Sequence, residues 1–132
     1  MYAHDIALAA AGVIGSATAL VHGVLTQRLM VRPIAAALRN DKHTGRAIAR
    51  LVPMLLHFST AAWFAGGLAL IAAASWFNPD AKLATGVLVG AMFLYGALGN
   101  FWATNGKHPG WMLMAMAVVL IGYGLSGGGT AG

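Results

Sequence analysis

The sequence predicts an all-α fold: an integral membrane protein, built as an antiparallel four-helix transmembrane bundle. Three observations predict it. Only 8% of the 132 residues are charged and 59% are hydrophobic, whereas soluble domains carry about 25% charged residues. The apolar residues fall into four runs, and short connectors join them. Helices joined by short connectors in lipid lie antiparallel. We expect a single domain over 1–132.

The four apolar runs define the expected spans, at residues 6–30, 51–77, 83–104 and 111–125. The first run follows Asp5 and lacks a basic leader, so we expect it to be retained. The second contains no Lys, Arg, Asp or Glu over 27 residues, and about 20 apolar residues suffice to cross a bilayer. The turns NPDAK and NGKHPG separate the later spans, and Pro, Gly and Asn favour such turns. The glycine-rich tail 126–132 is expected to be flexible.

The connector 31–50 and its edges hold most of the positive charge, on Arg28, Arg32, Arg39, Lys42, Arg46 and Arg50. With Lys107 in the loop 105–110, seven of the eight basic residues fall on one side of the expected membrane. The positive-inside rule makes that side cytoplasmic. We therefore expect a bacterial inner membrane protein with both termini outside. Pro33 and the alanines after it predict a helical hairpin that extends the first two spans, with arginines among the lipid headgroups.

Several classes of function are excluded. The net charge of +5 does not indicate a nucleic-acid partner, because the basic residues lie between apolar runs. The absence of cysteine excludes disulfides, thiolate metal sites and thioether haem attachment. No carboxylate lies inside an expected span, so hydrolytic acid/base chemistry has no support. Whether the chain is an enzyme stays open.

Polar residues in the spans form the main candidate site. His22 lies eight residues before Met30, and His57 lies seven residues after Arg50 on a helix that runs the other way. Both imidazoles are therefore expected about 10–12 Å inside the inner boundary. Asn100 of the third span reaches the same depth. At helical spacing, Thr26 shares a face with His22 and Thr60 shares one with His57, which predicts a polar layer in the bundle.

Three interpretations of this layer stay open. In the first, His22 and His57 are the axial ligands of a haem b iron, as helix bundles hold cofactors between facing side chains. The propionates would then meet Arg28, Arg32, Arg46 or Arg50, and the slot would be lined by Met54, Phe58 and Phe64. In the second, His22, His57 and Asn100 form a structural or proton-relaying hydrogen-bonded cluster. In the third they ligate a metal ion, although zinc requires three or four ligands.

The remaining histidines, the methionines and the small residues of the spans are not expected to bind a ligand. His4, His43 and His108 are expected to be solvated or interfacial, and the methionines of MLMAM are expected to pack as apolar side chains. Small residues at spacing four are expected to pack inside the bundle; they are Gly15, Ala19, Gly23, Gly86 and Gly90.

The stretch LHFSTAAWFAGGLAL resembles the copper-resistance CopD-like membrane families. Their helices carry a histidine, a tryptophan one or two turns later and then Gly-Gly-Leu, positions that here are His57, Trp63, Gly66, Gly67 and Leu68. In size and in its membrane-embedded histidine, the chain also resembles the four-helix HemJ-type protoporphyrinogen oxidases, but their acidic and arginine-lysine signatures are not evident. The resemblance implies that His57 faces a haem or a metal.

The sequence thus predicts a small membrane protein that binds haem b and serves a redox, electron-transfer or haem-associated role. A second hypothesis is an accessory subunit that packs in a larger membrane complex. A third is a small transporter or proton-relay protein. The expected partners are the lipid bilayer and either further copies of the chain or a larger complex.

Overall fold

The computed structural model describes residues 2–41 and 45–127, which are helical apart from short turns and contain no strand. The helices are α1 (Ala3–Thr26), the π-helical segment η1 (Gln27–Val31), α2 (Arg32–Asn40), α3 (Arg46–Trp76), α4 (Pro79–Thr104) and α5 (Gly110–Ser126). The all-α prediction is confirmed. Lys42, His43 and residues 128–132 of the predicted flexible tail lie outside the described residues.

Three helices are long and apolar enough to cross a membrane. They are the continuous helix Ala3–Asn40, which comprises α1, η1 and α2, then α3, and α4. The fourth helix, α5, is apolar but has only 17 residues. The first helix does not end at Met30, the expected end of its span, but continues ten residues further to Asn40, because Pro33 occupies its favoured place in the first turn of α2.

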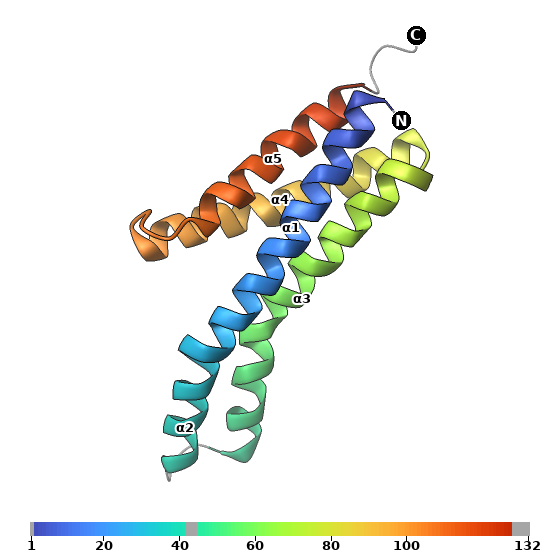
Figure 1. Ribbon diagram of the computed structural model, residues 1–132. Coiled ribbons are helices and arrows are strands. Elements are labelled where there is room, and N and C mark those ends of the chain that lie inside the picture. The colour runs from blue at the N-terminus through green and yellow to red at the C-terminus, as the bar shows by residue number, and fades with distance from the viewer. Residues whose placement is uncertain (1, 42–44, 128–132) are drawn as a thin grey trace.

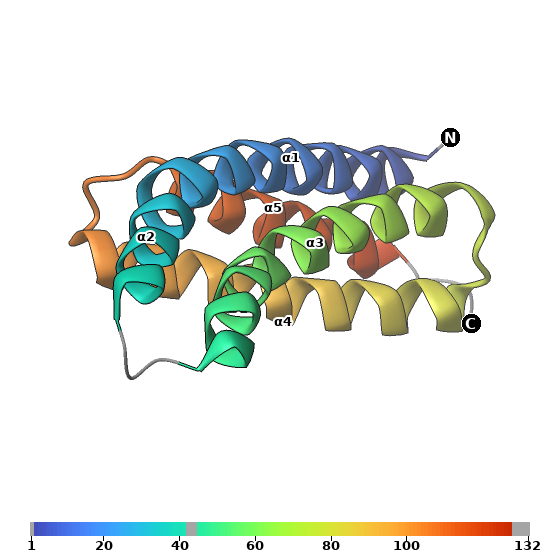
Figure 2. The ribbon, with the colours of Figure 1, turned by 90° about the horizontal axis from the view of Figure 1, so that it is seen from below.

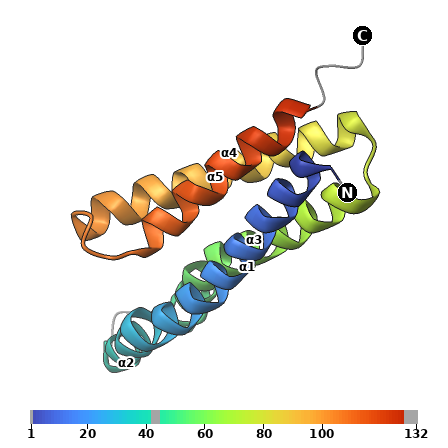
Figure 3. The same cartoon turned by 45° about the horizontal axis from the view of Figure 1, so that its top comes forward.

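Successive long helices run in opposite directions (Figure 1). The pair α1/α3 and the pair α4/α5 meet near the two chain ends and diverge toward the α2 end and the α4–α5 loop, as Figures 1 and 3 both show. In Figure 2, which views the bundle from below, α1 is at the top with α5 beside it, and α3 lies between α1 and α4. α1 contacts α3 and α5, and α4 contacts α5 and α3. The divergence leaves α1 and the start of α5 on either side of a wedge.

Glycines allow the close approach of α1 and α3. A Cβ at Gly67 would lie 2.6 Å from the Gly12 carbonyl oxygen and would also meet the Ser16 hydroxyl, and a Cβ at Gly12 would lie 2.5 Å from the Gly67 oxygen. Phe93 of α4 packs directly on Gly15, and Trp63 of α3 packs on Gly96. Glycines on the facing helices therefore leave room for the two large rings in the core.

The glycines predicted to pack inside the bundle do so. Phe93 covers Gly15, Thr60 of α3 covers Gly23, and Ile121 and Leu125 of α5 cover Gly90 and Gly86. Ala19 is fully buried. The predicted packing role of these residues is confirmed.

The ends of α4 follow from local sequence. Asn78 caps its N-terminus by accepting a hydrogen bond of 2.9 Å from the Ala81 N–H, and Pro79 occupies the first turn. At its other end Asn105 and Gly106 have φ of 48° and 72°, the left-handed conformation that ends helices. Together these turn the chain back into α5.

The outer surface of the helices is apolar. Leu8, Leu70, Phe93 and Met114 are the largest fully buried side chains. Around them, large apolar residues stay exposed, among them Leu55 at 70% and Val119 at 71%. Met114 is buried while its neighbours Met112 and Met116 are exposed, in keeping with the predicted apolar packing role of MLMAM.

An ion pair ties the first turn of α1 to the first turn of α4. Asp5 Oδ1 accepts a hydrogen bond of 2.6 Å from Lys82 Nζ, and both residues lie just before the expected spans 6–30 and 83–104. The Lys82 hydrogen bond lowers the pKa of the Asp5 carboxyl below its ordinary value of 3.8, although burial acts in the opposite direction.

The lowered pKa predicts an acid-sensitive contribution to stability. The pair stabilises the fold fully above the ordinary pKa of Asp5, and this contribution is lost as the pH falls through the lowered folded-state pKa. Because both side chains are partly exposed, we expect Asp5→Asn to cost at most about 1 kcal/mol near neutral pH. Thermal melts of both proteins in detergent over a descending pH series test this. A melting difference that does not shrink at low pH would contradict it.

Candidate functional site

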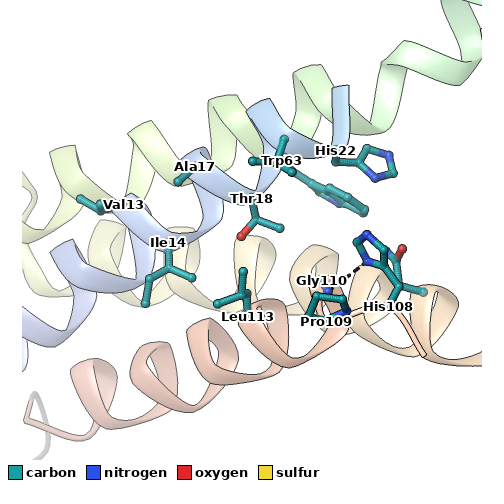
Figure 4. Close-up of a pocket in the computed structure, with 12 residues that line it drawn as sticks. Val13, Ile14, Ala17, Thr18, His22, Trp63, His108, Pro109, Gly110 and Leu113 are labelled. Atoms are coloured by element: carbon teal, nitrogen blue, oxygen red, sulfur yellow. Dashed lines mark hydrogen bonds between the residues drawn. The ribbon is translucent and has the colours of Figure 1, made fainter. Parts of the chain in front are cut away.

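A cavity of about 360 Å³ lies in the wedge between α1 and the start of α5 (Figure 4). Its walls come from α1, α3, α4, the α4–α5 loop and α5. Most of the lining is apolar, and no charged side chain contributes to it. The lining residues are Val13, Ile14, Ala17, Thr18, Val21, His22, Trp63, Asn100, His108, Pro109, Gly110 and Leu113.

His22 enters the cavity from α1 and is fixed by hydroxyl groups. Its Nε2 lies 3.2 Å from Thr26 Oγ1, one turn further along the same helix, and 3.3 Å from Ser59 Oγ of α3. Its ring packs against the Trp63 ring with centroids 4.7 Å apart. The ring is thereby held in one orientation at the end of the cavity.

His108 enters the same cavity from the α4–α5 loop. Its Nδ1 accepts a hydrogen bond of 3.1 Å from the Gly110 N–H, and the backbone N–H of His108 donates to Thr104 Oγ1 at 3.4 Å. An Nδ1 that accepts from a backbone amide carries no proton, so the neutral ring bears its proton on Nε2. In Figure 4 the ring points toward Trp63 and His22.

Two further polar groups face the cavity. Asn100 of α4 donates from Nδ2 to the Gly96 carbonyl oxygen at 2.9 Å, which leaves its side-chain oxygen available. Thr18 of α1 is 8% exposed, and its hydroxyl has no hydrogen-bond partner within the described part of the chain. A buried hydroxyl without a partner costs about 1–3 kcal/mol, and the hydroxyls of Ser16 and Thr60, which do not line the cavity, are in the same state within the described residues.

His57, the second predicted ligand, lies elsewhere. Its Nε2 bonds to Gln27 Oε1 at 2.8 Å, and it does not line the cavity. Gln27 begins the π-helical segment η1, and Pro53 lies one turn before His57 in α3. A π-helical turn and an internal proline both interrupt regular helical hydrogen bonding. The His57–Gln27 bond therefore joins η1 to α3 at the level where the helical hydrogen bonding of both is irregular.

The remaining residues of the haem prediction do not surround one slot. Met54 and Phe58 are 69% and 71% exposed on the outside of α3. Arg28, Arg32, Arg46 and Arg50 are exposed on the helical hairpin formed by η1, α2 and the start of α3. His22 lines the cavity and His57 does not, and a haem b held by this pair stays a prediction.

Part of the predicted polar layer comes together around the cavity. His22, Thr26 and Asn100 lie together, the first two hydrogen-bonded and the third across the cavity. Thr60 packs on Gly23, and its hydroxyl is buried without a partner within the described residues. No group of three or more His, Cys, Asp or Glu that could hold a metal ion occurs in the described ranges.

Sequence reasoning gave His108 no role in the site, whereas helical spacing predicted that Thr18 shares the bundle-facing side of the first helix with His22, and both line the cavity. His108 was expected to be solvated or interfacial, because it lies in a turn; it is half-buried, and the turn folds its ring back over the start of α5. Thr18 lies one helical turn before His22, which is the signal that places both on one face of α1. His4, also expected to be solvated or interfacial, is partly exposed near the start of α1, where it bonds to the Tyr123 carbonyl oxygen at 2.8 Å and stacks on the Tyr123 ring.

Comparisons with protein-family models, with curated proteins and with solved structures found no match for this chain. The resemblance at His57 is therefore untested, and function is argued from the geometry.

Proposed function

We propose that this chain is an integral membrane protein that binds a small, mostly apolar molecule in the cavity between α1 and α5. Such a molecule places its apolar body along Val13, Ile14 and Leu113 and its polar end near His22 and His108. The observation that carries the proposal is the convergence of His22, His108 and Asn100 on a mostly apolar cavity of about 360 Å³, which Thr18 also lines.

The proposed location in a membrane is supported by length, composition and surface. Three helices are long and apolar enough to span a bilayer, and exposed Leu, Val and Phe side chains cover them. Exposed aromatic residues mark the two ends, with Tyr2 and Trp76 at one and Trp102 at the other, as interfacial belts require. The arginine-bearing hairpin would then lie on the cytoplasmic side and both termini outside.

The proposed binding role is supported by the make-up of the cavity. Ligand sites have volumes of about 300–1,000 Å³ and combine apolar walls with a few polar groups. The cavity, at about 360 Å³, lies at the lower end of that range. Its polar side chains are His22, His108, Asn100 and Thr18, supplied by α1, α4 and the α4–α5 loop. Groups from separate elements that converge on one space are what recognition of a ligand requires.

Filling the cavity is expected to abolish binding without unfolding the protein. Ala17 lines the cavity and is exposed, so Ala17→Leu occupies the space without removing a packing contact. We expect the wild-type protein, purified in mild detergent, to carry a small molecule that organic extraction and mass spectrometry detect, and Ala17→Leu to lose it. Ala65→Leu, at an exposed alanine of α3 outside the cavity, is the matched control.

The same samples decide between this proposal and the haem prediction. An absorption spectrum with a Soret band that disappears in His22→Ala and His57→Ala, and persists in His108→Ala, would support the predicted haem pair over the cavity. Equal recovery of the small molecule from wild type and Ala17→Leu would refute the proposed site.

A further inference from the structure

We propose that the molecule bound in the cavity has a quinone-type head: a planar, uncharged ring with carbonyl oxygens, carried on an apolar tail. This inference rests on the proposed function and specifies the chemistry of its ligand. It combines three properties of the cavity, which are its hydrogen-bond donors, its lack of charge and its aromatic wall.

The first property is a donor with no protein partner. The Gly110 N–H occupies His108 Nδ1, so Nε2–H is the free donor of the neutral ring. No hydrogen bond from this nitrogen to another described residue is found, and the ring points into the space next to Trp63 and His22 (Figure 4). This nitrogen can only donate, and it therefore selects an acceptor on the ligand.

The second donor is a hydroxyl group on the opposite wall. Thr18 Oγ1 is buried and lacks a partner within the described ranges, and Figure 4 shows the Thr18 side chain on the α1 wall, across from Pro109 and Leu113. A head with two acceptor oxygens on one ring would satisfy His108 and Thr18 together. A single oxygen has two lone pairs and could serve both donors only by lying within hydrogen-bond reach of each at once, whereas a ring with two carbonyl oxygens can offer one to each.

The absence of Asp, Glu, Lys and Arg from the lining disfavours ionic heads. None of the twelve lining residues is Asp, Glu, Lys or Arg. A carboxylate, phosphate or ammonium taken into this space would lose its hydration with no counter-charge to replace it. A carbonyl oxygen is neutral and accepts hydrogen bonds strongly, which matches what the walls offer.

The third property is a flat aromatic wall beside an opening to the expected lipid. Trp63 is 7% exposed and is held against Gly96, so it presents a rigid surface on which a planar ring can stack. Val13, Ala17 and Val21 line the cavity and are also exposed on the outer face of α1. The tail can therefore leave the cavity along α1 into the bilayer.

Decylubiquinone, a quinone ring with a ten-carbon tail, is the probe, added to the delipidated protein in detergent. We expect saturable quenching of Trp63 fluorescence that is lost in Trp63→Phe. His108→Ala is expected to weaken binding about tenfold and Thr18→Val severalfold, as the loss of one hydrogen bond each predicts. His108→Gln keeps an N–H at the position of Nε2 and should retain most of the affinity. His57→Ala, whose side chain lies outside the cavity, should bind as wild type does.

Two comparison ligands separate the quinone inference from the proposed function. Dodecanol carries one hydroxyl and dodecane carries no polar atom. If dodecanol displaces decylubiquinone at equal concentration, or if His57→Ala weakens quinone binding as much as His108→Ala, the quinone inference is refuted. If dodecanol binds, Ala17→Leu abolishes this binding and decylubiquinone does not bind, then the proposed ligand-binding function is supported and the quinone head group is refuted. If neither dodecanol nor decylubiquinone binds, both the quinone inference and the proposed function are refuted.

Discussion

Gly67→Ala is expected to disrupt the packing of α1 on α3 and to destabilise the fold strongly. The added Cβ would lie 2.6 Å from the Gly12 carbonyl oxygen and 2.8 Å from the Ser16 backbone nitrogen, and it would also meet the Ser16 hydroxyl. Backbone atoms cannot rotate away as a side chain can, so the two helices must separate. Overpacking of this kind costs about 1–3 kcal/mol, and here α1 and α3 also carry the cavity walls.

Gly99→Ala is the matched control for this result. Gly99 is also helical, in α4, and a Cβ there meets nothing within 4 Å. Alanine favours helix over glycine by about 0.8–1.0 kcal/mol, so Gly99→Ala is expected to be neutral or stabilising. Unfolding of both variants in detergent, followed by helical circular dichroism, measures the difference. Equal stability of the two variants would show that the Gly12–Gly67 contact is not close in solution.

This contact illustrates what the sequence could and could not predict. Spacing identified Gly15, Gly23, Gly86 and Gly90 as packing residues, and each contacts another helix. Gly67 was noted only as part of a resemblance. A glycine pair in an apolar helix fixes no partner, because which helix faces it depends on the rotation of α3 about its axis. Only tertiary packing sets that rotation.

The residues of the candidate site also fall into those that the sequence predicted and those that it could not place. Counting residues along each helix predicted a common depth for His22 and Asn100, and both line the cavity. The same counting grouped His57 with them, but depth does not determine the direction in which a side chain points. His57 instead meets Gln27 one helical turn beyond Gly23. His108 could not be placed by depth at all, since it belongs to a loop whose path depends on the left-handed turn at Asn105 and Gly106.

The membrane hypothesis makes the second prediction of large effect, which is that Leu94→Arg prevents normal insertion. Leu94 is 47% exposed on α4 and lies at the centre of the expected span 83–104. An arginine at the centre of a membrane helix costs about 2.5–3.5 kcal/mol on insertion-based scales. In a water-soluble bundle the same change would replace an exposed leucine by a charge, and it would leave the fold intact while raising solubility.

Leu29→Arg is the matched control, because the substitution is identical and its site differs only in position. Leu29 is 70% exposed in η1 and lies next to Arg28, where an arginine would join those already expected among the headgroups. We expect wild type and Leu29→Arg to resist alkaline extraction from membranes at similar levels, and Leu94→Arg to be degraded or extracted. The location in a membrane, and with it lateral entry of a ligand from lipid, would be refuted if Leu94→Arg accumulated as a folded, soluble protein.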